Sequence, residues 1–346
     1  MQSTFPSGVC QGSGIRVDQC GRKCICINGT LSACSRVRLD FLSLTPEEKQ
    51  RYLDTVKRVS TDAFYKPRYE YIMKKFEDFS DTNAFANNPA VSQFFPWLRF
   101  YLIEYENLLK SVDCRITVPF WDWTTAPTMP FNTSYFSNDL GFGNTIDPST
   151  QCVTTGPFRE SVWQVTPSAG GECLRRELDT TKSYPDGDLI ADVLIQPASD
   201  FAIFFNLLKF LVYDPVRCFV GGQMCSTDAP NDPAFLLLAA RIDAIFDQWQ
   251  KSGDGRESAR YGSDNTTLVG TELPVSAYNN NLQLPHGVAV EYGLPFHLRR
   301  QRSAQRRLRF PQRVATTPCL SEQVVSKLGS IPEETLIWLR SLCLPQ

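Results

Sequence analysis

Two long apolar stretches with helical spacing constrain the fold of this chain more than any other feature. One covers residues 94–110 and the other residues 233–249. The second has clear start signals, with Asn231 or Asp232 as N-cap and Pro233 at the first helical position. Large side chains recur at one-turn intervals in both stretches, and they include Phe94, Trp97, Tyr101, Tyr105, Phe235, Ile242 and Trp249. The pattern predicts a mainly α-helical protein.

Further helices are expected elsewhere in the chain. Residues 46–60 follow Thr45 as N-cap, with Pro46 at the first position and Glu48 completing a capping box. Residues 64–79 and 199–213 are also expected to be helical, as is a short stretch near residues 333–342. By contrast, residues 116–123 contain Pro119 and predict a short extended segment. Residues 124–195 are rich in Pro, Gly, Asn, Ser and Thr, which predicts a long irregular excursion.

Twelve cysteines and three glycosylation sequons favour an extracellular protein. Five of the cysteines lie in residues 1–36, a segment too short to bury a core of its own, so we expect disulfides to staple it. Because five is odd, at least one should bridge to the main body or stay free. A metal knuckle at Cys24 and Cys26 is the less favoured alternative. Candidate pairs elsewhere are Cys152 with Cys173 and Cys319 with Cys343, and the candidate glycosylation sites are Asn28, Asn132 and Asn265.

The first nine residues lack the charged and apolar regions of a signal peptide. We therefore expect a secreted protein whose signal peptide is missing from the given sequence. A cytosolic protein with free thiols is the alternative. The formal net charge of −2 gives no reason to expect a nucleic-acid partner, and no apolar run is long enough to predict a membrane span. The sequence names no other partner.

Three segments in a fixed order carry a family resemblance. They are Phe94-Phe95-Pro96-Trp97-Leu98-Arg99, then Val118-Pro119-Phe120-Trp121-Asp122-Trp123, then Asn231-Asp232-Pro233-Ala234-Phe235 continuing to Asp243 and Trp249. Gly221-Gly222-Gln223-Met224 and Gly156-Pro157-Phe158 also fit. Together they resemble the tyrosinase family of type 3 copper proteins, which includes catechol oxidases and molluscan haemocyanins. The resemblance covers roughly residues 37–252. It implies an antiparallel four-helix bundle with long irregular loops, in which six histidines hold two copper ions that oxidise phenols and catechols.

The resemblance fails at the ligand positions. Carried over motif by motif, these positions fall on Leu98, Ala239, Tyr213 and Arg217, with the other two near Lys74 and near Asn87 or Asn88. The chain contains only two histidines, His286 and His297, both in loop contexts without ligand spacing. We therefore expect no copper pair and no cofactor. A copper(I) site at Met224, Cys218 and Cys225 is a weaker alternative to disulfide or core roles.

The residues around the lost ligands remain those of the family. They include Trp97, Arg99, Asp232, Pro233, Asp243 and Trp249. We expect them to have structural roles, since Asn-Asp-Pro caps a helix and the tryptophans fill the bundle. Arg99 and Asp243 are predicted to pair across two helices, because an unpaired buried charge would be costly.

A run of seven arginines between Arg299 and Arg313 contains no acidic residue. It predicts either a solvated basic loop or a patch that contacts polyanions or the extracellular matrix. A third interpretation is a convertase-type cleavage site at Arg302, which would release residues 303–346.

These observations predict a Cys-rich segment at residues 1–36, a degenerate tyrosinase-like domain at 37–297, and an Arg-rich linker with a short C-terminal extension at 298–346. The expected function is that of a secreted pseudoenzyme with a structural, matrix or binding role. Two alternatives stay open. One is an oxidoreductase of the tyrosinase class with a non-standard metal site, and the other is a cleft-type binder of aromatic or peptide ligands.

Overall fold

A computed structural model describes residues 8–82, 85, 92–128, 131, 134–179, 184–253, 255–256 and 265–293. Helices dominate this part of the chain, as predicted. Helix α1 (Pro46–Thr61) begins with the expected capping box, in which Thr45 and Glu48 bond each other's backbone N–H groups. Helices α2 (Lys66–Ser80) and α3 (Phe94–Val112) match the two stretches that follow.

The second half of the bundle is one continuous helical run followed by a separate helix. The run consists of α5 (Phe201–Asn206), a π-helical stretch (Leu207–Tyr213) and α6 (Asp214–Val220). Pro215, near the start of α6, therefore lies inside this run, just after the π-helical stretch. Helix α7 (Ala234–Gln250) begins one residue later than expected, and the Asp232 side chain accepts from the Ala234 N–H.

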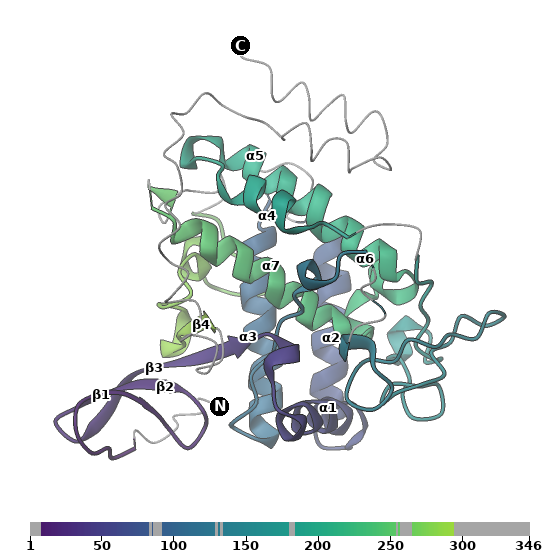
Figure 1. The fold of residues 1–346 in the computed structure, drawn as a ribbon, viewed down its shortest axis with the longest axis horizontal. Coiled ribbons are helices and arrows are strands. Elements are labelled where there is room, and N and C mark those ends of the chain that lie inside the picture. The colour runs from purple at the N-terminus through teal and green to yellow at the C-terminus, as the bar shows by residue number, and fades with distance from the viewer. Residues whose placement is uncertain are drawn as a thin grey trace, which may run out of the picture.

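Helices α2 and α3 lie side by side, and α5, α6 and α7 run across them (Figure 1). One continuous apolar core joins these helices, and aromatic rings fill much of it. Trp97 stacks on Phe79 with ring centroids 4.0 Å apart, and Trp249 stacks on Phe204 at 4.1 Å. The expected helical bundle is confirmed.

The N-terminal segment forms a small sheet, which the sequence did not predict. Its strands β1 (Gly14–Val17), β2 (Lys23–Ile27) and β3 (Thr30–Leu39) are antiparallel, and β4 (Val290–Gly293) adds parallel to β3. Cys10–Cys26 and Cys24–Cys34 are disulfides, so these cysteines do not form a metal knuckle. The strand β3 continues past residue 36, the expected domain boundary.

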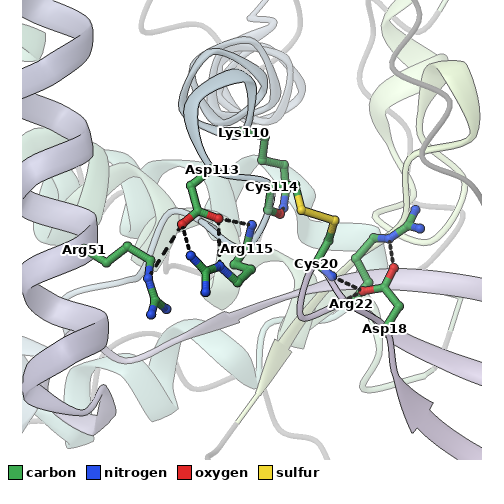
Figure 2. The surroundings of a disulfide bond; sticks show 8 residues. All are labelled: Asp18, Cys20, Arg22, Arg51, Lys110, Asp113, Cys114 and Arg115. Atoms are coloured by element: carbon green, nitrogen blue, oxygen red, sulfur yellow. Dashed lines mark hydrogen bonds and ion pairs between the residues drawn. A yellow bond between two sulfur atoms is a disulfide. The ribbon is translucent and has the colours of Figure 1, made fainter.

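The fifth cysteine of this segment forms a disulfide with the main body, which was one of the two expected outcomes. Cys20 is bonded to Cys114, which follows the end of α3 (Figure 2). Asp18 accepts from the Cys20 N–H and pairs with Arg22, while Lys110 donates to the Cys114 carbonyl (Figure 2). The disulfide and these bonds fix the sheet against the C-terminal end of α3.

The excursion between residues 124 and 195 is irregular for most of its length, and Cys152–Cys173 closes part of it as predicted. Its end is helical, contrary to expectation: α4 (Gly187–Leu194) starts at Asp186, whose side chain accepts from two backbone N–H groups. Leu189, Ile190 and Val193 bury one face of this helix, and that burial offsets its short length.

Several expectations concern residues outside the described ranges. They are Asn87, Asn132, His297, the arginine run with Arg302, the pair Cys319 and Cys343, and the helix near 333–342. Within the described ranges, none of the helices has the length and apolar character needed to cross a bilayer.

Candidate functional site: the centre of the helical bundle

Apolar side chains occupy three positions in the bundle that the sequence predicts to be former copper ligands or their neighbours. Leu98 on α3 and Leu238 and Ala239 on α7 have no exposed surface. They belong to the same core cluster as Trp97 and Phe235. Packing of this kind stabilises the bundle without any polar partner.

Tyr213 and Arg217 lie one turn apart, as the family spacing predicted, and both are buried. The Arg217 guanidinium donates to the backbone carbonyls of Met224 and Ser226 at 2.8 and 2.7 Å. It also lies 5.1 Å from the centre of the Tyr213 ring and 5.9 Å from that of Phe76. Arg217 is therefore a buried cation held by carbonyls and aromatic faces.

Lys74, near which the sequence predicts a former ligand position, does not lie at this centre. Lys74 lies on the outer face of α2, where it pairs with Glu77 and Asp78. Phe76 takes the inner face and contacts Phe235 at 4.8 Å between ring centroids. Successive helical residues turn by 100°, so a shift of two residues moves a side chain to the opposite face. The buried stripe Tyr69, Ile72, Met73, Phe76 and Phe79 was the available signal for the inner face.

Lys209 is a second buried cation beside Tyr213, and the sequence did not predict it. Its ammonium group donates to Asp214 at 2.9 and 3.1 Å. The rings of Phe85, Phe94 and Tyr213 lie within 4.8–5.2 Å of that group. Burial lowers the pKa of Lys209, while Asp214 opposes the shift.

The donor set at this centre does not fit a pair of copper ions. Copper pairs of this type need imidazole nitrogens. The described centre instead offers a guanidinium, an ammonium group, a phenol and apolar side chains. Within the described residues, only Asp18, Cys24 and Cys34 form a metal-type cluster, and two of these are joined in a disulfide. Cys218 and Cys225 are likewise bonded to each other, which favours the disulfide interpretation over a copper(I) site.

The predicted pair between Arg99 and Asp243 is confirmed. The Arg99 Nε donates to Asp243 Oδ1 at 2.6 Å, and both side chains are fully buried. The remaining Arg99 nitrogens donate to Gln250 and to the backbone carbonyls of residues 278 and 279. Tyr292 on β4 donates to the second Asp243 oxygen at 2.6 Å. The network thus ties α3, α7 and β4 together.

A second buried pair joins α7 to the irregular region. Arg176 donates from two nitrogens to the two oxygens of Asp232, at 2.6 and 2.8 Å. Its third nitrogen donates to the carbonyls of Phe142 and Gly143. The sequence predicted Asp232 as a cap but missed Arg176, because no periodicity marks residues 124–195.

Glu106 on α3 is the counter-ion of two arginines from β3. Arg36 and Arg38 donate to its two oxygens at 2.8 and 3.2 Å. Burial alone would raise the pKa of Glu106, but Arg38 and Arg36 outweigh it and lower that pKa to about 2. The carboxylate therefore stays ionised and anchors the strand to the bundle.

Asp40 lies where β3 meets the extended segment at residues 116–123. The Tyr135 hydroxyl donates to it, and Asp122, which pairs with Arg241 at 3.1 Å, lies nearby. Burial raises the pKa of Asp40 to about 7, and the charge of Asp122 adds to the shift.

This pKa predicts a pH-dependent stability. Protonated Asp40 favours the folded state, so its contribution is full below pH 3.8 and is lost as the pH rises through about 7. We expect Asp40→Asn to raise the free energy of unfolding by up to about 4 kcal/mol at pH 8. Near pH 4 the difference from the parent chain should vanish. Urea unfolding at both pH values measures it, and an equal gain at pH 4 would contradict the titration argument.

Three other candidate residues lie at the surface. His286 is exposed in a loop at residues 285–287, as expected, and has a positive φ of 60°. Asn28 and Asn265 are exposed, which leaves both sequons accessible.

Comparison with known proteins agrees with this geometry. Residues 68–252, more than half of the chain, match the model of the common central domain of tyrosinase. A tyrosinase of Streptomyces lincolnensis is 33% identical over 234 residues, which span 62% of this chain and 82% of the relative. An N-acetyl-6-hydroxytryptophan oxidase of Emericella nidulans is 25% identical, over 69% of this chain and 81% of the relative.

A solved structure shares the fold. The polyphenol oxidase of Thermothelomyces thermophila, a mutant form, aligns with a TM-score of 0.58 at 17% identity, over 75% of this chain and 89% of that one.

These findings contradict the expectation that the chain has no cofactor, because tyrosinases and polyphenol oxidases form a dicopper family. The matched central domain, the 33% identity and the shared bundle together establish the membership. The chain belongs to the tyrosinase family.

Proposed function

We propose that this chain uses the tyrosinase fold as a non-oxidising scaffold with a structural or binding role. One observation carries the proposal: the family's ligand positions on α3 and α7 hold Leu98 and Ala239, both fully buried in apolar core. A phenol bound at such a centre would meet no group that can accept its electrons. The scaffold residues around the centre, such as Arg99 and Asp243, have structural partners that explain them.

The same proposal places the protein outside the cell. Five disulfides join the described cysteines, and such a number suits an oxidising compartment. Glycosylation at Asn28, Asn132 and Asn265, matrix contact through residues 299–313 and cleavage at Arg302 belong to this proposal. So does the division of the chain at residues 36 and 297.

An oxidation assay tests the proposal. Purified protein, preincubated with copper(II), is given a monophenol and a catechol, and quinone formation is followed by absorbance. We expect a rate equal to that of the copper(II) blank, because the centre lacks imidazoles. The Streptomyces lincolnensis tyrosinase treated in the same way is the positive control. Saturable quinone formation above the blank would contradict the proposal.

The second candidate is an oxidoreductase of the tyrosinase class. It is favoured by the names of the relatives, which include tyrosinases and an N-acetyl-6-hydroxytryptophan oxidase. Oxidation in the assay above would establish this candidate. If there is none, a thermal-shift screen of aromatic and peptide ligands separates a cleft-type binder from a purely structural protein.

A further inference from the structure

A cavity of about 450 Å³ opens away from the bundle centre, between helices α1 and α2 and the irregular region. Its walls are the last residues of α1, the first turn of α2 and the segment from Glu160 to Gly171. The buried rings of Tyr69 and Trp163 form part of the lining and meet edge to face, with centroids 6.2 Å apart. The volume falls within the range of small-molecule sites.

Several hydrogen-bond acceptors line the cavity. Ser60 and Thr61 both donate their hydroxyl hydrogens to the Lys57 carbonyl at 2.8 Å, so only their oxygen lone pairs face other partners. Glu70 and Glu160 add two carboxylates. The cavity therefore offers at least four side chains that accept hydrogen bonds.

Two buried donors on the same walls are engaged elsewhere. The Trp163 indole N–H donates to the Asn231 carbonyl, and the Thr166 N–H donates to the Asn231 side chain at 2.7 Å. Lys66 is the cation of the lining, and its ammonium group lies 3.8 Å from Glu70. Glu160, which is exposed, has no ion pair among the described residues.

The backbone adds to this electrostatic bias. Ser60 and Thr61 form the C-terminal end of a 16-residue helix, where unsatisfied carbonyls carry partial negative charge. The first N–H groups on the α2 side are already used, since Lys66 and Tyr69 donate to the carbonyls of Asp62 and Tyr65. Aromatic ring faces also favour a positively charged ligand.

We propose that this cavity binds a primary ammonium group, carried by a free alkylamine or by a lysine side chain of another protein. Glu160 and Glu70 accept from the ammonium group, the hydroxyls of Ser60 and Thr61 complete its shell, and Tyr69 lines the aliphatic stem. Lys66 competes for Glu70 from within the chain. The site is separate from the bundle centre and does not depend on whether the protein oxidises phenols.

Titration of the full-length protein with n-butylammonium chloride at low salt, followed by saturation-transfer NMR and calorimetry, tests the site. We expect Glu160→Gln to weaken binding by about tenfold, because a charge-assisted bond is lost. Lys66→Met should tighten it by about threefold, because Glu70 is then free. Glu47→Gln, an exposed change at the opposite end of α1, is the matched control and should leave binding unchanged.

Nα-acetyl-lysine amide and its ε-acetylated form distinguish the two sources. Binding of butylammonium and of the lysine amide, with none for the ε-acetylated form, supports a lysine side chain as the ligand. Binding of butylammonium alone supports a free amine. Equal binding of butyrate, or butylammonium affinity unaffected by Glu160→Gln in a variant with unchanged thermal stability, would overturn the proposal.

Discussion

Asp243→Asn is expected to lower the free energy of unfolding by about 3–5 kcal/mol. The substitution removes the charge that faces Arg99 at 2.6 Å and Arg38 at 3.6 Å, both in fully buried positions. It leaves the Arg99 guanidinium in the core with only neutral acceptors. Urea unfolding with the disulfides intact measures this change in the free energy of unfolding. It follows from the shift of the midpoint when both variants have the same dependence of the free energy on urea concentration.

A double-mutant cycle with Arg99→Met isolates the pair. Each single substitution already breaks the interaction. The double variant should therefore lose less free energy of unfolding than the two single variants added together, by about 2–3 kcal/mol. Lys74→Met is the surface control. Its pairs with Glu77 and Asp78 are largely exposed, so the substitution should leave the free energy of unfolding nearly unchanged. Strict additivity of Arg99→Met and Asp243→Asn would mean that the pair itself adds nothing to stability.

Local signals with a fixed chemical partner were predictable from the sequence. The capping box at Thr45 and Glu48 needs only a three-residue spacing, and the structure has it. Arg99 and Asp243 lie in motifs whose helices face each other. Because an unpaired buried charge is costly, their pairing could be predicted, and the structure has it. Cys152 and Cys173 are the two cysteines of one irregular stretch, and they are bonded.

Other features depend on tertiary contacts that no local pattern carries. Arg176 lies in a stretch without periodicity, and its partner is 56 residues away. The N-terminal strands carry Ile25 and Ile27 outward and the disulfide cysteines Cys24 and Cys26 inward, which reverses the usual apolar alternation. Lys74, near which the sequence predicts a former ligand position, is exposed on α2, whereas the buried stripe through Phe76 faces the core.

Asp232 combines two tasks that are normally separate. One oxygen accepts from the Ala234 N–H and caps α7, and both oxygens accept from Arg176. Arg176 in turn holds the carbonyls of Phe142 and Gly143, so the carboxylate links the bundle to the irregular region. Neither side chain has any exposed surface.

Asp232→Ala should therefore lower the free energy of unfolding by at least about 4 kcal/mol. The substitution leaves the Arg176 guanidinium without its counter-ion and removes the cap of α7. Asp232→Asn keeps an oxygen that can cap α7 but removes the charge, so we expect it to recover about 1 kcal/mol of that loss. Arg175→Met changes the neighbouring arginine, whose partner Glu172 is exposed, and should stay within about 0.5 kcal/mol of the parent. The three values come from the same urea series. Equal changes in the free energy of unfolding for Asp232→Ala and Arg175→Met would contradict this argument. The buried pair would then not hold residues 142–176 against α7, and apolar packing alone would hold the irregular region to the bundle.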